Sequence, residues 1–283
     1  MAHRTPRRRK DLAKGVILHI VLISISAVML VPFLWQLSTS LKESGTEFAW
    51  PPQWIPRPPV WRNYVDALTL LPFDIYLKNS LIISVSATFG SVMSAALAGY
   101  GFARLRFPGR DFLFGLCLSV LMLPGVVTLI PQFILFRHLG WVDTFKPLIV
   151  PAYFGGSAFA TFMIRQFFLT IPLELDEAAR IDGAGSFRIF GWILLPLLKP
   201  ALITMGILNF LFYWNDFMGP LIYISSSEKM TLTLGLRAFQ GQWGTEWNYM
   251  MAASAVMTVP VLILFFSAQR YFMEGIVMTG LKG

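Results

Sequence analysis

The chain has 283 residues, of which 55% are hydrophobic and only 13% are charged. Soluble domains carry about 25% charged residues, so much of the surface of this chain requires an apolar solvent. The net charge of +8 does not indicate a nucleic-acid-binding protein, because Lys and Arg lie mainly in loops that flank apolar runs. A transmembrane helix takes roughly 20 apolar residues, so the chain is long enough for six spans with loops.

Residue types that commonly build catalytic or metal sites are few and scattered. Cys117 is the single cysteine, so no disulfide can form within the chain, and His3, His19 and His138 lack the spacing of metal ligands. No polar cluster of the kind that an enzyme requires is visible. We therefore expect no catalytic site, no metal site and no cofactor bound by this chain.

A basic segment opens the chain and precedes its first apolar run. Six of the first 14 residues are Lys or Arg, and the run at 15–37 is too long for the apolar region of a signal peptide. Backbone groups in lipid must be paired within their own segment, so apolar runs of this length are expected to be helices. We predict an all-α membrane protein with a cytoplasmic basic N-terminus at 1–14 and a transmembrane domain at 15–283. Its six predicted spans lie at about 15–37, 79–101, 112–136, 147–169, 200–224 and 250–271.

The distribution of Lys and Arg predicts the orientation of these spans. With the N-terminus inside, the inner segments hold 15 of the 23 basic residues and the outer segments hold 8. Cytoplasmic loops carry the excess of Lys and Arg in membrane proteins. The bias predicts that both termini are cytoplasmic.

The inner segment 170–199 is too long for a simple connection and too polar at its start for a span. Pro172 suits the first turn of a helix, and Glu174, Asp176 and Glu177 fall where the helix dipole favours anions. Gly183 suits the end of that helix. A second helix is expected from Ser186 to the residue before Pro196. Spacing places Leu175, Ala178, Ala179 and Asp182 on one face of the first helix.

The small residues on that face leave two interpretations open. They let another protein approach closely, or they belong to an ordinary helix on the membrane surface. A resemblance favours the first. Segment 170–199 resembles the EAA loop of ABC-importer permeases at seven fixed positions: Glu177, Ala178, Ala179, Gly183, Ile193, Leu195 and Pro196. In that family the loop forms a coupling helix that docks on the ATPase, which implies this role for Glu177, Ala178, Ala179, Asp182 and Gly183.

Further segments resemble the carbohydrate importers of the maltose type, and most closely the shorter of their two permeases. They are Asn79–Ser84, Ala178–Ala184, Tyr213–Phe217 and the terminal Gly280–Gly283. The resemblance implies a complex with a second permease, two ATPase copies that bind ATP and Mg²⁺, and an extracytoplasmic solute-binding protein. This chain has no Gly-Lys dipeptide and hence no phosphate-binding loop. It is therefore expected to be a permease of the bacterial inner membrane and not the ATPase.

Asp216 is the one acidic residue predicted well inside a span, near its outer end. Ionisable residues within a membrane are functional candidates, and Asn209, Tyr213, Trp214 and Asn215 lie nearby on the same predicted helix. Aromatic rings stack on sugars and polar groups bond their hydroxyls, so these five residues are candidates for a substrate pathway. The alternative is a cap that packs helices at the aromatic belt of the outer interface, and this alternative is the preferred one.

The outer segment 225–249 resembles the periplasmic loop that reaches into the binding protein in maltose-type permeases. The resemblance implies that Gln240, Gln242 and Trp243 contact the binding protein, although the loop can equally pack on its neighbours.

Two alternatives to a sugar permease stay open. An importer of glycerol phosphate or a polyol is the nearest, and no basic residue lies deep in a predicted span to meet an anionic solute. An ion-coupled secondary transporter would need midplane ion sites and inverted repeats, and no clear repeat is visible.

Overall fold

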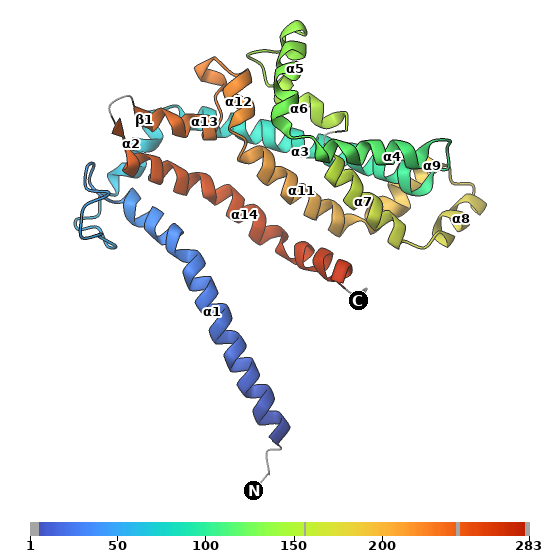
Figure 1. The fold of residues 1–283 in the computed structure, drawn as a ribbon, viewed down its shortest axis with the longest axis horizontal. Helices are drawn as coiled ribbons and strands as arrows, with labels where there is room; N and C mark the ends of the chain where they lie inside the picture. The colour runs from blue at the N-terminus through green and yellow to red at the C-terminus, as the bar shows by residue number, and fades with distance from the viewer. Residues whose placement is uncertain (1–5, 156, 242–243, 281–283) are drawn as a thin grey trace. The chain divides into compact units, whose positions relative to one another are not determined.

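The computed structural model describes residues 6–155, 157–241 and 244–280, and the side chains of residues 14–155, 157–241 and 245–270. Nearly all of its elements are helices (Figure 1), which confirms the predicted all-α class. In chain order the elements are α1 (Pro6–Ser40), α2 (Arg62–Thr69), α3 (Phe73–Arg104), α4 (Arg110–Ser119), η1 (Val120–Met122), α5 (Gly125–His138), α6 (Lys146–Tyr153), α7 (Ala158–Thr170), α8 (Glu174–Ile181), α9 (Ser186–Arg188), the π-helix η2 (Ile189–Leu194), α10 (Leu195–Leu197), α11 (Lys199–Trp214), α12 (Met218–Tyr223), η3 (Ser227–Lys229), α13 (Leu232–Leu236), η4 (Arg237–Phe239), β1 (Gln240–Gly241), β2 (Gly244–Thr245) and α14 (Trp247–Gly280).

Among the described residues, four helical stretches are long and apolar enough to cross a membrane. They are Lys14–Ser40, Phe73–Arg104, Trp247–Arg270 and Lys146–Thr170, the last of which contains α6 and α7. Two bent helix pairs raise the number of candidate spans to six if each pair is counted as one span. The bent pairs are Arg110–Met122 with Gly125–His138, at 101°, and Ser186–Leu197 with Lys199–Trp214, at 78°. The number of spans thus agrees with the sequence-based prediction when the bent pairs are included.

Three predicted spans differ from the observed helices. The span at 147–169 is divided, since α6 ends at Tyr153 and α7 begins at Ala158. The span at 112–136 is broken where Leu123 is extended and Pro124 precedes α5, because a residue before proline is pushed out of the helical region. The span at 200–224 is also interrupted, since α11 ends at Trp214 and α12 begins only at Met218. Asp216 therefore lies between two helices and not inside one.

The second inner helix was predicted to stop before Pro196, and this is wrong. Helical structure continues from Ser186 through α9, η2 and α10 to Leu197. Pro196 lies in the first turn of α10, where its missing N–H group costs least. The chain bends at Leu198 instead.

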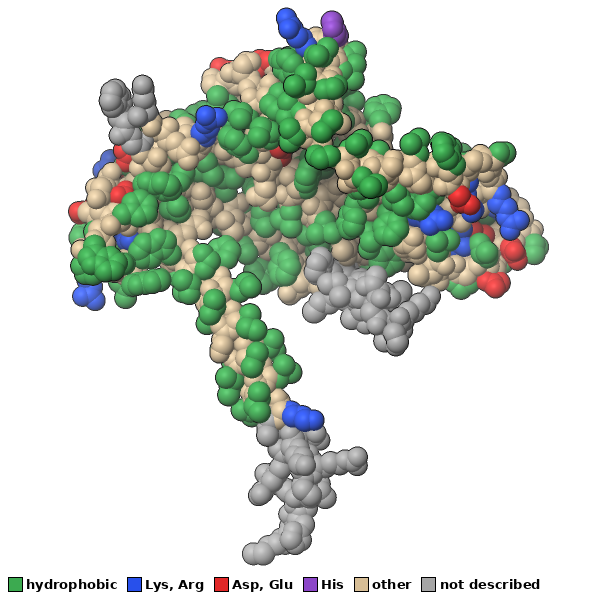
Figure 2. Space-filling model, in the orientation of Figure 1, with side chains coloured by type: hydrophobic (Ala, Val, Ile, Leu, Met, Phe, Trp, Pro, Cys, Tyr) green, Lys and Arg blue, Asp and Glu red, His purple; other side chains and the backbone are tan. Residues whose placement is uncertain are grey.

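The chain divides into two compact units, one formed by residues 1–70 and 239–256 and the other by residues 71–238 and 257–283. In the first unit, most side chains of α1 between Val16 and Leu37 are hydrophobic and exposed (Figure 2). The loop after α1 is ordered by Asn63, whose side chain donates to the carbonyls of Ser40 at 2.9 Å and Lys42 at 2.8 Å. Strands β1 and β2 pair antiparallel.

In the second unit, α3 is the central helix and packs on α6, α7 and α11. Ala95 and Ala96 are buried in this core, and a Cβ atom on Gly99 would lie 3.1 Å from the backbone nitrogen of Arg165. Small residues let helix backbones approach closely in membranes. This close packing brings the last turn of α3 to the cluster that contains Phe168, Ala179 and Phe190.

Candidate functional site

Helix α8 is a short helix that lies between α7 and α9 in the chain, as its sequence predicts. Glu174, Asp176 and Glu177 occupy its first turn, where the positive end of the helix dipole stabilises carboxylates. The helix ends at Ile181, and Gly183, two residues further on, has a φ of +79°. Glycine adopts this left-handed conformation without the strain that other residues carry. We refer to residues 171–186, which contain α8 and both of its ends, as the α8 segment.

The predicted ATPase-docking residues divide between the two sides of α8. Glu177, Ala178, Asp182 and Gly183 are exposed, whereas Ala179 is 7% exposed and belongs to the core cluster. Leu175 is also exposed. Charged side chains of this unit gather at the end that carries α8 (Figure 2). The outer side of α8 is therefore available to a partner, while Ala179 fixes the inner side.

Arg104 and Asp176 form a buried ion pair beneath α8 that sequence reasoning missed. Arg104 Nε lies 3.5 Å from Asp176 Oδ2, and their side chains are 2% and 8% exposed. Arg104 Nη2 also donates to the Ile171 carbonyl at 2.7 Å. In the sequence, Arg104 contributes to the charge bias that predicts orientation, and Asp176 is one of the acids near the start of a helix. The two residues are distant in the chain, and no local pattern indicates that they form a pair.

The five candidates for a substrate pathway occupy different environments. Asn209 is buried, and its Oδ1 accepts from the Ser91 hydroxyl at 3.1 Å, which joins α11 to α3. Trp214 is buried and stacks on Phe210. Tyr213 is half-buried. Asn215 is exposed, and its side chain donates to the Leu211 carbonyl at 2.8 Å.

Asp216 forms contacts typical of a helix cap. Its Oδ1 accepts from the backbone N–H of Gly219 at 3.1 Å, and its carbonyl accepts from the Thr233 hydroxyl at 2.7 Å. A side-chain acceptor for an early N–H group is what the start of a helix requires. A Cβ atom on Gly219 would collide with the Asp216 carboxylate. These contacts support the capping interpretation of Asp216 over a role in binding solute.

Of the three residues expected to contact a binding protein, the structure describes one. Gln240 is exposed in β1, and its side-chain nitrogen lies 3.9 Å from the sulfur of Met250. Gln242 and Trp243 lie outside the described residues.

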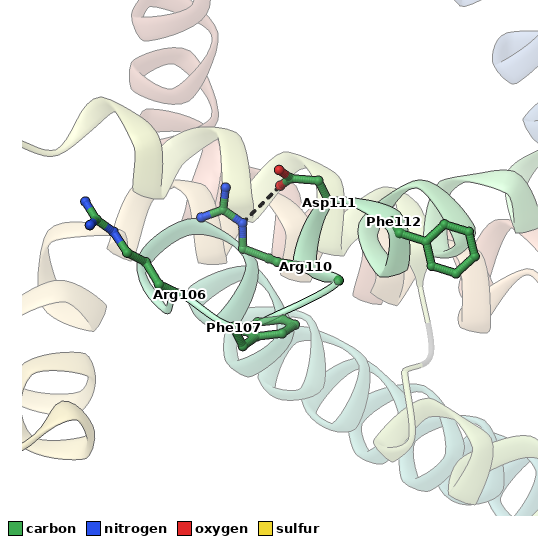
Figure 3. A pocket seen from close by; sticks show the side chains of 6 residues that line it. Arg106, Phe107, Arg110, Asp111 and Phe112 are labelled. Atoms are coloured by element: carbon green, nitrogen blue, oxygen red, sulfur yellow. Dashed lines mark hydrogen bonds and ion pairs between the residues drawn. The ribbon is translucent and has the colours of Figure 1, made fainter.

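A pocket of about 400 Å³ lies in the turn between α3 and α4 (Figure 3), and none of the predicted site residues lines it. Arg106, Phe107, Arg110, Asp111 and Phe112 line it, and Arg110 Nε is paired with Asp111 at 3.0 Å. Among the described residues, no group of three or more His, Cys, Asp or Glu side chains is arranged to hold a metal ion.

Known proteins resemble this chain in sequence and in fold. Residues 87–276 match the family model described as "Binding-protein-dependent transport system inner membrane component". The chain is 33% identical to the sn-glycerol-3-phosphate transport system permease protein UgpE of Yersinia pestis, over 92% of this chain and 94% of the relative. It is 32% identical to the trehalose/maltose transport system permease protein MalG of Thermococcus litoralis, over 97% and 99%.

A solved structure shares the fold. A chain of a bacterial ABC transporter involved in the import of the acidic polysaccharide alginate superposes with a TM-score of 0.79 and 22% identity, over 93% of this chain and 98% of that chain. A family match over most of the chain, together with relatives above 30% identity, assigns the sequence. The chain belongs to the family of inner membrane components of binding-protein-dependent transport systems.

Proposed function

We propose that this chain is a permease subunit of an ATP-driven importer that takes up a carbohydrate, with α8 as its contact to a separate ATPase. One observation carries the coupling role. Glu177, Ala178, Asp182 and Gly183 are exposed on a helix whose other side is held in the core by Ala179 and Asp176. A helix exposed on one side and fixed on the other can bind a partner and pass on its movement.

The partners follow from the family and from what the chain lacks. It has no phosphate-binding loop, so a separate ATPase would hold ATP and Mg²⁺ and hydrolyse the nucleotide. The proposed complex contains this chain, a second permease, two ATPase copies and an extracytoplasmic solute-binding protein. The predicted inner segments, which include α8 and both termini, hold the excess of Lys and Arg. This excess supports a cytoplasmic location of both termini.

Alternating access is the proposed mechanism. ATP binding closes the ATPase pair, α8 moves with it, and the paired permeases open outwards to accept solute from the binding protein. Hydrolysis restores the inward-facing state. A ligand shifts such an equilibrium only through contacts that differ between the two states, and the exposed side of α8 would supply those contacts for the ATPase.

A carbohydrate is the favoured solute. One relative that aligns with nearly the whole chain is named a trehalose/maltose transport system permease protein. Helix α11 has no basic residue beyond Lys199 at its start, whereas phosphate recognition relies on Arg or Lys. The second candidate is sn-glycerol-3-phosphate, which the name of another relative favours at similar identity.

Purification and uptake together test the proposal. We would tag this protein, purify it in mild detergent from its native membrane and identify co-purifying chains by mass spectrometry. Recovery of an ATPase, a second permease and a solute-binding protein is expected. Proteoliposomes holding this complex should take up labelled maltose or trehalose with ATP inside, and unlabelled glycerol-3-phosphate should not compete. Recovery of the chain alone, with uptake that survives ATP depletion, would support a secondary transporter instead.

A further inference from the structure

The last turn of α3 contacts the beginning, the middle and the end of the α8 segment. Arg104 Nη2 donates to the Ile171 carbonyl at 2.7 Å, and Arg104 Nε lies 3.5 Å from Asp176 Oδ2. One turn earlier, the Tyr100 hydroxyl donates to the Ser186 carbonyl at 3.1 Å. The α8 segment is therefore attached at three points to a single transmembrane helix.

The Arg104–Asp176 pair is poorly explained as a stabilising device. Burying two charges costs solvation energy that their attraction repays only with excellent geometry and further hydrogen bonds. Here Arg104 Nε and Asp176 Oδ1 are buried without a hydrogen-bond partner in the protein. Replacing a buried ion pair with apolar residues of similar size is often neutral or stabilising. A buried ion pair of this kind can instead fix one arrangement of two elements against each other.

The helix that receives this contact is also the best connected in its unit. Helix α3 packs on α6, α7 and α11. Further along it, Ser91 bonds to Asn209 of α11 and Ser94 donates to the Ala152 carbonyl of α6 at 3.0 Å. Close-packed interiors transmit displacement, so a movement imposed on the Arg104 end of α3 is passed to the helices around it.

We propose that Arg104 and Asp176 are the positioning residues through which a displacement of α8 is passed to α3. The inference rests on the proposed function and adds a residue pair that the docking motif does not contain. Glu177 and its exposed neighbours would bind the ATPase. The buried pair would ensure that α3 moves when α8 moves.

The ratio of solute transported to ATP hydrolysed tests the proposal in the reconstituted complex. Asp176→Asn removes the charge with little change of shape. We expect the variant complex to retain its ATPase subunits and its ATP hydrolysis, while the transport ratio falls at least fivefold. Asp176→Glu keeps the charge and should recover at least half of the ratio. Glu174→Gln removes an exposed acid from the same turn of α8 and should leave the ratio unchanged.

Arg104→Lys provides a second variant in case Asp176→Asn does not accumulate in the membrane. It keeps the buried charge but loses the planar fork that reaches Ile171 and Asp176 together, so the ratio should again fall. A wild-type ratio in either variant would overturn the proposal. Equal losses of assembly, hydrolysis and uptake, with an unchanged ratio, would also overturn it, because the pair would then only anchor the fold. Failure of the proposed function is a separate outcome, in which the wild-type complex itself shows no ATP-driven uptake.

Discussion

Lys229 lies with its Nζ atom 2.9 Å from Oδ2 of Asp143, an ion pair that joins the loop after α5 to η3. Asp143 also accepts from the backbone N–H groups of Ser225 at 3.0 Å and Ser226 at 2.9 Å, and from the Ser226 hydroxyl. These donors hold the pKa of the Asp143 carboxyl well below its usual range, with the Ser226 hydrogen bonds as the largest cause. Asp143 thus fixes one connecting loop to another.

Acidification tests this link. A carboxylate whose pKa is lowered by folding stabilises the native state above its unfolded pKa of about 3.9, and the contribution is lost only as the pH falls through the lower folded pKa. Amide hydrogen exchange at Ser225 and Ser226, corrected for intrinsic rates, should show the same protection at pH 4 as at pH 7. Asp143→Ala should reduce that protection about fivefold or more at both pH values.

Asp143→Asn is the matched control for that experiment. Asp143 has a positive φ of 58°, which asparagine tolerates better than alanine. The amide keeps an acceptor oxygen for Ser225 and Ser226 but loses the charge that attracts Lys229. Protection in this variant should lie between wild type and Asp143→Ala. Protection that collapses in the wild type between pH 6 and pH 4 would show that the pKa of Asp143 is not lowered.

Lys42, in the first unit, should make stability depend on pH in the alkaline range. Lys42 is 2% exposed. Its Nζ atom donates to the Glu47 carbonyl at 3.1 Å and lies 4.0 Å from the centre of the Trp35 ring. Burial lowers the pKa of Lys42, against a smaller opposing effect of Glu47. The folded state therefore binds its proton less tightly than the unfolded chain does. Stability should rise as the pH rises through the folded pKa and level off near the unfolded value of about 10.4.

Thermal unfolding of the purified protein in detergent, measured from pH 7 to pH 10, checks this prediction. The wild type should gain thermal stability across that range. Lys42→Met keeps the length of the side chain without the charge, so its pH profile should be flatter. Identical profiles for the two proteins would contradict the assignment.

Gly235 should tolerate no side chain. An alanine Cβ at this position of α13 would lie 2.5 Å from the ring of Tyr76, which is itself 3% exposed and has no room to move. Overpacking of this kind costs about 1–3 kcal/mol. Gly90→Ala is the matched comparison, because its Cβ would also meet a ring, that of Tyr153, which is 43% exposed and so has more open space around it than Tyr76. We expect Gly235→Ala to lower the unfolding temperature more than Gly90→Ala; the reverse order would refute the packing argument.

Two substitutions of Asp216 distinguish a structural role of its carboxylate from a role in the solute pathway. If its carboxylate caps α12 through Gly219, asparagine should replace it, because asparagine caps helices as well as aspartate does. We expect Asp216→Asn to keep the wild-type apparent KM for uptake, and Asp216→Ala to lose about 1 kcal/mol of stability. A tenfold rise of KM in Asp216→Asn, with normal protein level, would place the carboxylate in the pathway.

The sequence was informative where a signal is local. Apolar runs located the long helices, and Pro172, the early acids and Gly183 defined α8. It failed where the outcome depends on distant contacts. The presence of proline alone did not distinguish Pro124, where the chain breaks, from Pro196, through which helical structure continues. Arg104 and Asp176 meet only because α3 and α8 pack together, so their pairing could not be read from either local pattern.

Glu177→Lys tests whether the exposed side of α8 binds the ATPase. The substitution reverses a charge on the exposed side while leaving Ala179 and the Arg104–Asp176 pair in place. Glu174→Lys makes the same change in the same turn, outside the docking motif. We would measure the amount of ATPase that co-purifies with each variant from membranes containing equal amounts of this chain. We expect at least tenfold less ATPase, and no ATP-driven uptake, for Glu177→Lys, with near-normal values for Glu174→Lys. Wild-type co-purification and uptake in Glu177→Lys would show that this side of α8 does not bind the ATPase.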